Sequence, residues 1–228
     1  MMKIKVIKNR LALVAFIFAF SFMSVAASAK TTFSDVKEDA WYYKGVEHAV
    51  NNEYMVGTSR DHFNPNLSIT RAQLAQIMYA YDGKPDIQPE PFVDAPSNTW
   101  YSRAATYVTV SSTTGFNYPP HLEVGYFDPY ASVTREQAIF VLYHFSWNRD
   151  KDMRIDNSAY EIANKLEDIN EECKTPFAWA ISQKIISGTK KGLEPKLNVT
   201  RAQMATILYA YDKLGPYYID ENDDPGDN

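Results

Sequence analysis

The chain of 228 residues contains one cysteine, so it can form no internal disulfide and its fold must be held together by packing. That residue, Cys173, lies in the acidic stretch "NEECKTPF", which disfavours the reactive thiolate and argues against a catalytic cysteine. Histidine is also scarce, and the four histidines share no metal-ligand spacing (His48, His62, His121 and His144). We therefore expect neither a metal site nor a cofactor.

Long apolar runs are confined to the N-terminus. Residues 1–29 combine four basic residues with the run "LALVAFIFAFSFMSV" and the small residues "ASA", which is typical of a cleaved signal peptide. A retained membrane anchor is the alternative, but the run is short for a membrane span. Without these four of its 23 basic residues, the chain has 19 basic against 28 acidic residues, a net charge of −9. Such a secreted chain should attract neither nucleic acid nor an anionic membrane.

One short phrase recurs three times, at Thr70, Thr134 and Thr200. It is preceded by "FNPNLSIT", "FDPYASVT" and "LEPKLNVT", each with an aromatic residue or leucine seven positions before the threonine. Further upstream, "FSDV", "FVDA" and "LEDI" also correspond. Agreement at fixed spacing predicts an internal repeat.

Each copy indicates a helix, a proline-containing loop and a second helix, because apolar residues recur at helical spacing on both sides of the proline. Gly57 and Gly188 are expected to end the turn after the first helix. One such helix pair cannot bury its apolar face alone, so the copies should share a core in a mainly α protein. We place repeats at 31–84, 90–147 and 166–215, a partly helical linker at 148–165 and an acidic tail at 216–228.

The phrase Thr-Arg-x-Gln contains a capping box, in which the threonine and glutamine side chains satisfy backbone N–H groups at the helix start. The predicted boxes are Thr70 with Gln73, Thr134 with Gln137, and Thr200 with Gln203. An aspartate also recurs once per copy, at Asp35, Asp94 and Asp168. These aspartates could pair with the phrase arginines, but capping of their own first helices is the interpretation we favour.

Capping does not explain the arginine of the phrase, which is Arg71, Arg135 or Arg201. A cation in the first helical turn is disfavoured by about 0.3–1 kcal/mol. We therefore predict an anionic partner that engages both the guanidinium and the free N–H groups of the helix start. An internal salt bridge is the alternative. Under the first interpretation, replacing the arginines abolishes binding and leaves the thermal melt nearly unchanged.

The pattern "FSDV…WYY…AV…MVG…FNPNLSITRAQ" resembles the S-layer homology domain, which usually occurs as three tandem copies. This resemblance implies a pseudo-threefold spindle with a ligand groove between neighbouring repeats. It also implies non-covalent binding to a secondary cell-wall polysaccharide, often bearing a pyruvate ketal, through the motif arginine.

Other residues are assigned to the expected grooves. Trp41 and Trp100 could stack on sugar rings, with burial in the core as the alternative; Gly57, Thr58, Gly188 and Thr189 could present donors to the ligand. The chain departs from the family in having glutamine where glutamate is usual. The third copy has Glu172 where the others have tryptophan, and the second has an irregular loop. We therefore expect unequal grooves.

These observations predict a secreted carbohydrate-binding repeat protein of the bacterial cell wall and cell surface, not an enzyme. The acidic residues come one per copy, which does not suit the paired carboxylates of a glycosidase. The alternative function is an envelope adaptor that binds other proteins through the repeats or the tail.

Overall fold

A computed structural model describes residues 33–110, 116, 125–147 and 149–216 of the protein. The predicted signal peptide, nearly all of the acidic tail and most of the irregular loop in the second copy, including His121, lie outside these residues. All of the described residues belong to one compact unit. The description below concerns this unit alone.

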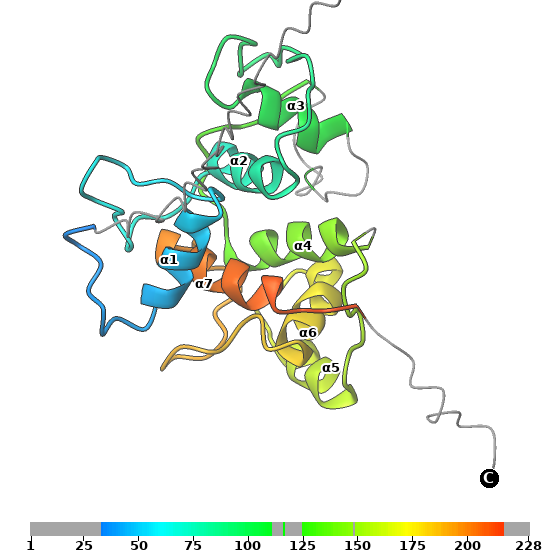
Figure 1. The fold of residues 1–228 in the computed structure, drawn as a ribbon. Coiled ribbons are helices and arrows are strands. Elements are labelled where there is room, and N and C mark those ends of the chain that lie inside the picture. Colours follow the sequence, from blue (N-terminus) through cyan, green and yellow to red (C-terminus); the bar gives the residue numbers. More distant parts are fainter. Residues whose placement is uncertain (1–32, 111–115, 117–124, 148, 217–228) are drawn as a thin grey trace, which may run out of the picture. The chain divides into compact units, whose positions relative to one another are not determined.

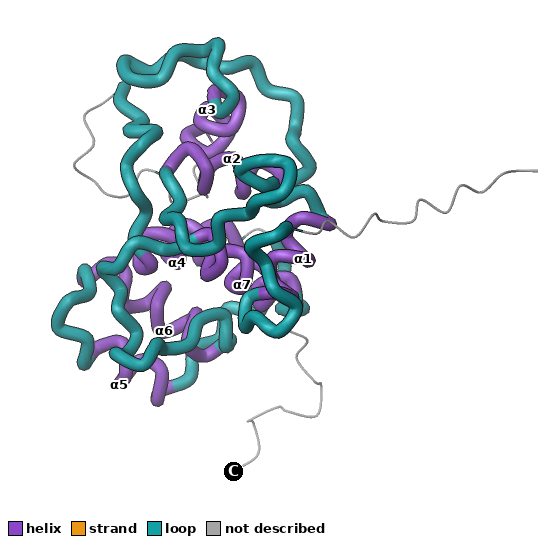
Figure 2. Tube along the Cα trace, turned by 90° about the vertical axis from the view of Figure 1, so that its left-hand side faces the viewer, coloured by secondary structure: helices purple, strands orange, loops and turns teal. Residues whose placement is uncertain are grey.

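The described part of the chain is helical and contains no strand, only isolated β-bridges, so the prediction of a mainly α fold is confirmed (Figures 1 and 2). None of its helices is long and apolar enough to cross a membrane. The short helix α5 falls in the predicted linker and packs against α6. The elements are α1 (Tyr43–Asn51), α2 (Arg71–Tyr81), α3 (Ser102–Val110), α4 (Arg135–Ser146), α5 (Asn157–Asn164), the 3-10 turn η1 (Glu171–Cys173), α6 (Lys174–Ser182) and α7 (Arg201–Asp212).

Three helices, α2, α4 and α7, begin directly after the threonine of the repeated phrase, and each has a complete capping box. In α2, for example, the Thr70 hydroxyl accepts from the Gln73 N–H at 3.3 Å, and Gln73 Oε1 accepts from the Thr70 N–H at 3.0 Å. The phrase therefore sets where each of these helices starts.

Helix pairs form between copies of the repeat and not within them. Helix α1 packs against α7, α3 against α2, and α6 against α4, so each first helix covers the phrase helix of another copy (Figure 1). Contact between α1 and α7 is close, because a Cβ added at Gly45 would lie 2.8 Å from the backbone of Thr206. One continuous core of buried side chains draws on all three pairs.

A closed ring of backbone hydrogen bonds joins the residues just before the phrase threonines. The Ile69 N–H donates to Val199 O at 3.0 Å, the Val199 N–H to Val133 O at 2.8 Å, and the Val133 N–H to Ile69 O at 3.1 Å. All three side chains are buried. The same contact is thus made three times, and the third closes on the first.

The helix starts are occupied by carbonyls from the loop of another copy. In α2, the Arg71 N–H donates to Ala131 O at 2.9 Å and the Ala72 N–H donates to Pro129 O at 3.0 Å. The corresponding groups of α4 donate to Leu197 O and Pro195 O, and those of α7 to Leu67 O and Pro65 O. The expectation that these N–H groups are free for a ligand is therefore wrong.

The glycines after the first helices do not end them. The left-handed residues that follow α1 and α6 are Glu53 (φ 58°) and Lys184 (φ 55°), four positions before Gly57 and Gly188. Close packing explains the first glycine, because a Cβ at Gly57 would lie 2.5 Å from the ring of Phe33. The turn was predicted one helical turn too late, since a left-handed residue need not be glycine.

Candidate functional site

The three phrase arginines are almost fully buried, with 4–7% of their surface exposed. Each guanidinium donates through Nε and Nη2 to two backbone carbonyls in the loop of another copy. The acceptors are Phe127 O (2.9 Å) and Phe116 O (3.2 Å) for Arg71, Leu193 O (3.0 Å) and Ser187 O (3.1 Å) for Arg135, and Phe63 O (2.7 Å) and Val56 O (2.5 Å) for Arg201. The arginines therefore tie neighbouring copies together, so we expect them to contribute to stability, which the sequence did not indicate.

Burial lowers the pKa of all three guanidinium groups, because removal from water disfavours the charged form. Nearby carboxylates oppose this effect: Asp35 acts on Arg201 and Glu194 on Arg135. Within the described part of the chain, neither Arg135 nor Arg201 forms an ion pair with a carboxylate. An internal salt bridge therefore does not explain these two arginines.

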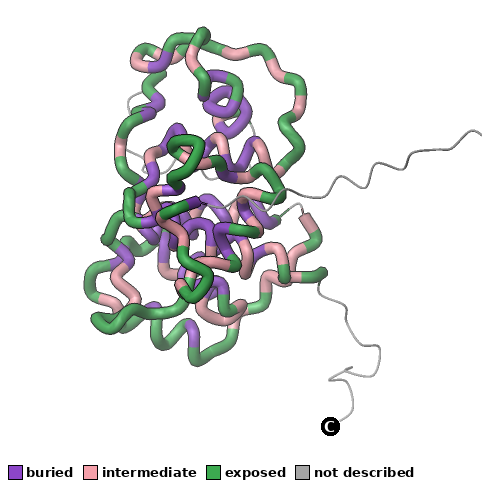
Figure 3. Tube along the Cα trace, turned by 60° about the vertical axis from the view of Figure 1, so that its left-hand side comes forward, coloured by how far each residue is buried: buried purple, intermediate pink, exposed green. Residues whose placement is uncertain are grey.

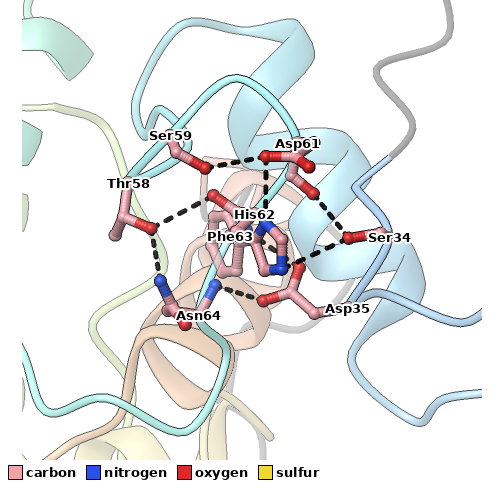
Figure 4. Close-up of polar contacts among 8 residues, drawn as sticks. All are labelled: Ser34, Asp35, Thr58, Ser59, Asp61, His62, Phe63 and Asn64. Carbon is pink, nitrogen blue, oxygen red and sulfur yellow. Dashed lines mark hydrogen bonds and ion pairs between the residues drawn. The ribbon is translucent and has the colours of Figure 1, made fainter.

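Two of the recurrent aspartates hold the loops whose carbonyls receive the arginines. Asp35 accepts from the Phe63 N–H at 2.9 Å and the Asn64 N–H at 2.7 Å, as Figure 4 shows. Asp94 makes the same pair of contacts, at 2.8 and 2.7 Å, with the second loop. Helix α1 instead has Tyr42 at its N-cap, without a side-chain cap, so the favoured interpretation of Asp35 as a helix cap is wrong. Asp168 is exposed.

The two threonines predicted to serve a ligand use their donors within their own loops. The N–H and hydroxyl of Thr58 both donate to His62 O, at 2.9 and 3.2 Å (Figure 4). In Thr189 the N–H donates to Gly192 O at 2.7 Å and the hydroxyl to Glu194 at 2.5 Å. These contacts fix the shape of each loop, and a ligand would have to displace one of them to gain a threonine donor.

Figure 4 also shows Ser34 in contact with Asp61 and His62, two adjacent residues that lie 27 and 28 positions further along the chain. His62 Nδ1 lies 2.9 Å from Asp61 Oδ1, and its Nε2 lies 3.5 Å from the Ser34 hydroxyl. That hydroxyl donates to Asp61 O at 2.9 Å, so its proton is directed at a carbonyl and not at the imidazole. All three residues are exposed. The arrangement fastens the loop to the first turn of the copy and lacks the geometry of an activated nucleophile.

Trp41 and Trp100 are exposed, at 66% and 62%, which excludes burial in the core. Each indole stands edge-on to the tyrosine that follows it, with ring centroids 5.2 Å apart for Tyr42 and 5.1 Å for Tyr101. The fully buried tryptophan is Trp179 in α6, where the pattern gave no such prediction. The two exposed indoles present apolar faces to solvent.

Two cavities, of about 440 and 370 Å³, lie against the predicted site residues, and both have the size of small-ligand sites. The first is lined by Trp41, Arg135, Ile185, Ile186, Ser187, Gly188, Thr189, Gln203, Thr206 and Ile207. The second is lined by Glu53, Tyr54, Met55, Val56, Gly57, Thr58, Gln73, Gln76, Ile77, Ala80, Lys84, Trp100 and Arg201. We call them the Arg135 groove and the Arg201 groove.

The two grooves use equivalent positions from three copies of the repeat. In the Arg201 groove, Gln73 belongs to the first copy, Trp100 to the second and the arginine to the third. Trp41 and Gln203 take the places of Trp100 and Gln73 in the Arg135 groove. Each groove thus contains one of the predicted tryptophans, one arginine, one glycine and one threonine, although these residues are far apart in the sequence.

Sequence reasoning missed several lining residues. Gln76, Ile77 and Ala80 follow Gln73 at helical spacing on one face of α2, and none of these three was predicted to line a groove. Arg71 lies apart from these grooves, with its guanidinium carbon 5.7 Å from the ring centre of Phe116. Most of the loop around Phe116 lies outside the described residues. The part of the chain that the structure describes holds no cluster of potential metal ligands.

Comparison with known proteins supports the resemblance seen in the sequence. The S-layer homology domain model matches residues 32–75 and 172–205. Those segments contain Arg71 and Arg201, both loops whose carbonyls accept hydrogen bonds from Arg135 and Arg201, and the start of α7.

Three curated relatives also match. An endoglucanase of Bacillus sp. (strain KSM-635) is 27% identical over 218 residues, which cover 91% of this chain and 22% of the relative. The surface-layer 125 kDa protein of Lysinibacillus sphaericus is 29% identical over 93 residues, 40% of this chain and 8% of the relative. An amylopullulanase of Thermoanaerobacterium thermosulfurigenes is 26% identical over 185 residues, 78% of this chain and 9% of the relative.

The chain thus spans less than a quarter of the length of each of these relatives. The domain match and the surface-layer relative together imply a location at the cell surface or cell wall.

Proposed function

We propose that this chain is a non-catalytic anchor that binds an acidic secondary cell-wall polysaccharide, of the pyruvylated kind, in the Arg135 and Arg201 grooves. The observation that carries the proposal is the repeated combination of a nearly buried guanidinium and an exposed indole in one cavity of ligand size. The matches to the S-layer homology domain and to a surface-layer protein support the same function.

The arginine recognises an anion with the part of the guanidinium that the loop leaves unused. Nε and Nη2 of Arg135 and Arg201 are engaged by carbonyls, whereas no contact with a described residue involves Nη1. No fully buried side-chain nitrogen or oxygen of the described residues lacks a partner, so Nη1 reaches accessible space. Because both arginines line a cavity, we infer that Nη1 faces it and donates to a ligand carboxylate.

Electrostatics favours such a ligand. A cation removed from water gains more from an opposite charge than an exposed one does, because the effective dielectric is lower. The glutamine of the capping box adds to this, since its Oε1 accepts from the threonine N–H and its amide N–H₂ remains for the groove. Glutamate at the same position would place a second carboxylate beside the bound one. Exposed Trp41 and Trp100 then offer apolar surface to the sugar rings.

The rest of the predicted organisation belongs to this proposal. We infer three repeats in a pseudo-threefold arrangement, supported by the closed ring of Ile69, Val133 and Val199 and by the cyclic pairing of helices. Export through an N-terminal signal peptide is the route by which the anchor reaches the wall. The grooves hold a glycan without reacting with it.

Co-sedimentation with purified cell walls tests the proposal. The double variant Trp41→Ala with Trp100→Ala should stay in the supernatant while the unaltered protein pellets. Because both indoles are largely exposed, the variant should melt within a few degrees of the parent, as exposed substitutions cost about 0.5 kcal/mol or less. Trp147→Ala is the matched control, since that indole is 58% exposed but lines neither groove.

The contribution of the glycan can be separated from that of peptidoglycan. Walls from which the secondary polysaccharide has been extracted should fail to pellet the unaltered protein. Equal pelleting by the double tryptophan variant, or by stripped walls, would show that these grooves are not the anchor.

A further inference from the structure

The two grooves differ at one end, and we propose that this difference makes the Arg201 groove specific for a glycan segment with two acidic groups, the second bound by Lys84. The Arg135 groove takes a segment with a single acidic group. This inference rests on the proposed function and names a specificity that the function alone does not require.

The Arg201 groove is the longer of the two along its phrase helix. Its lining follows one face of α2 from Gln73 through Gln76 to Ala80, and continues past the helix end to Lys84. Seven residues of helix between Gln73 and Ala80 span about 10 Å at 1.5 Å per residue. Arg201 and Lys84 both line this groove, and its helix face from Gln73 to Lys84 exceeds the length of one sugar ring.

The Arg135 groove stops earlier on α7. Its lining includes Gln203, Thr206 and Ile207, but it does not include Ala210 or the residue equivalent to Lys84, which is Leu214. The helix face of this groove therefore carries no second cation. The loop sides also differ, with Ile185, Ile186 and Ser187 where the other groove has Tyr54, Met55 and Val56.

Lys84 is already paired, but weakly. Its Nζ lies 3.1 Å from a carboxylate oxygen of Glu53, and the two side chains are 46% and 78% exposed. Exposed ion pairs of this kind contribute little to stability, because water and salt screen them. A ligand carboxylate or phosphate can therefore replace Glu53 at Lys84. Both residues line the groove, so the exchange takes place where the ligand lies.

Glu53 also affects the preference between a neutral and an anionic sugar beside Lys84. A neutral sugar at this end leaves the Lys84–Glu53 pair undisturbed, whereas an anionic sugar gains Lys84 and is repelled by Glu53. Removing the lysine should abolish the preference for a second acidic group. Removing the charge of the glutamate should strengthen it.

Calorimetric titration of the Trp41→Ala protein, in which the Arg135 groove is impaired, tests this inference at low salt. One probe is the methyl glycoside of a pyruvylated N-acetylhexosamine, which has one carboxylate. The second is the disaccharide in which a uronic acid is added to it. The two-acid probe should bind about fivefold more tightly, the free-energy equivalent of one exposed charge pair of about 1 kcal/mol.

Substitutions at the far end of the groove should separate the two probes. Lys84→Met should bring the two-acid probe to the affinity of the one-acid probe or below it, because Glu53 then repels the second acid unopposed, and should leave the one-acid probe unchanged. Glu53→Gln should tighten the two-acid probe alone. Lys184→Met is the matched control, since this exposed lysine occupies the position of Glu53 after α6 and does not line the Arg135 groove.

The possible failures are distinct. Equal binding of both probes, or a Lys84→Met effect on both, would overturn the second anion site while wall binding and the proposed function stand. Binding of neither probe by a protein that still pellets with walls would also overturn it. If the unaltered protein is folded but does not pellet with walls, the proposed function itself would be overturned.

Discussion

Replacing Arg201 by alanine should destabilise the protein, contrary to what its position in the sequence suggests. The change removes two hydrogen bonds, from Nε to Phe63 O and from Nη2 to Val56 O, that reach across 138 and 145 residues of chain. It also removes the guanidinium from above the ring of Phe63, where its central carbon lies 4.3 Å from the ring centre. The loop of the first copy would lose its attachment to α7.

The magnitude follows from these contacts. A hydrogen bond to a charged group contributes about 1.5–3 kcal/mol, and a buried carbonyl left without a donor costs about 1–3 kcal/mol. The two terms overlap, and water can reach part of the emptied site, so we expect about 3–5 kcal/mol in total. For a folded unit of this size, 1 kcal/mol corresponds to about 2–4 °C in melting temperature. Arg201→Ala should therefore lower the melting temperature by about 6–20 °C.

Differential scanning calorimetry of Arg201→Ala, Arg201→Lys and Trp100→Ala measures this effect. The lysine variant should fall between the other two, because an ammonium group cannot span both carbonyls with the geometry of a guanidinium. Trp100→Ala should melt close to the parent, since 62% of the indole is exposed. A melting temperature of Arg201→Ala within 3 °C of the parent would refute the reasoning and would return the arginine to a purely ligand-binding role.

Three further predictions concern the loops and the helix contacts. Asp35→Ala should lower the melting temperature by several degrees through the loss of two loop N–H contacts, whereas Asp168→Ala, at an exposed position, should not. The hydrogen bond to Asp61 raises the pKa of His62 above 6.5, so the protonated imidazole should stabilise its loop below that pH and lose this effect as pH rises through the raised pKa. NMR titration should show this midpoint above 6.5, and Asp61→Asn should return it to about 6.5. Gly45→Ala should destabilise the protein by about 1–3 kcal/mol in urea denaturation, because the new methyl group meets the backbone of α7.

Local signals predicted the local structure well. The three phrase helices start where Thr-x-x-Gln predicts, because a capping box involves only residues within four positions of one another. The turn after the first helix was misplaced for a related reason. Glycine is the usual left-handed residue, but Glu53 adopts that conformation here and Gly57 is required by contact with Phe33. That contact joins residues distant in sequence, which a local pattern does not encode.

The grooves could be predicted only in part, because their residues come from three copies at once. Spacing identified the arginines and tryptophans, whereas the glutamines were predicted only as helix caps and not as groove residues. The pattern did not indicate that Gln76 and Lys84 extend one groove, since Trp100 and Arg201, which complete its lining, come from other copies. Nor did it indicate that the aspartates fasten loops, because the N–H groups that donate to Asp35 belong to residues 28 and 29 positions away.

The arginine in the first helical turn is unfavourable only for an isolated helix. In the folded protein the N–H groups of Arg201 and Ala202 donate to carbonyls of the first loop. The guanidinium donates to two more carbonyls of the first copy, Phe63 O and Val56 O. Four oxygen dipoles therefore point at the helix start, and they offset the positive end of the macrodipole. The position that repels a cation in a lone helix thus accepts one here. The same contacts leave the guanidinium positively charged without a carboxylate partner, which is the property that an acidic ligand needs.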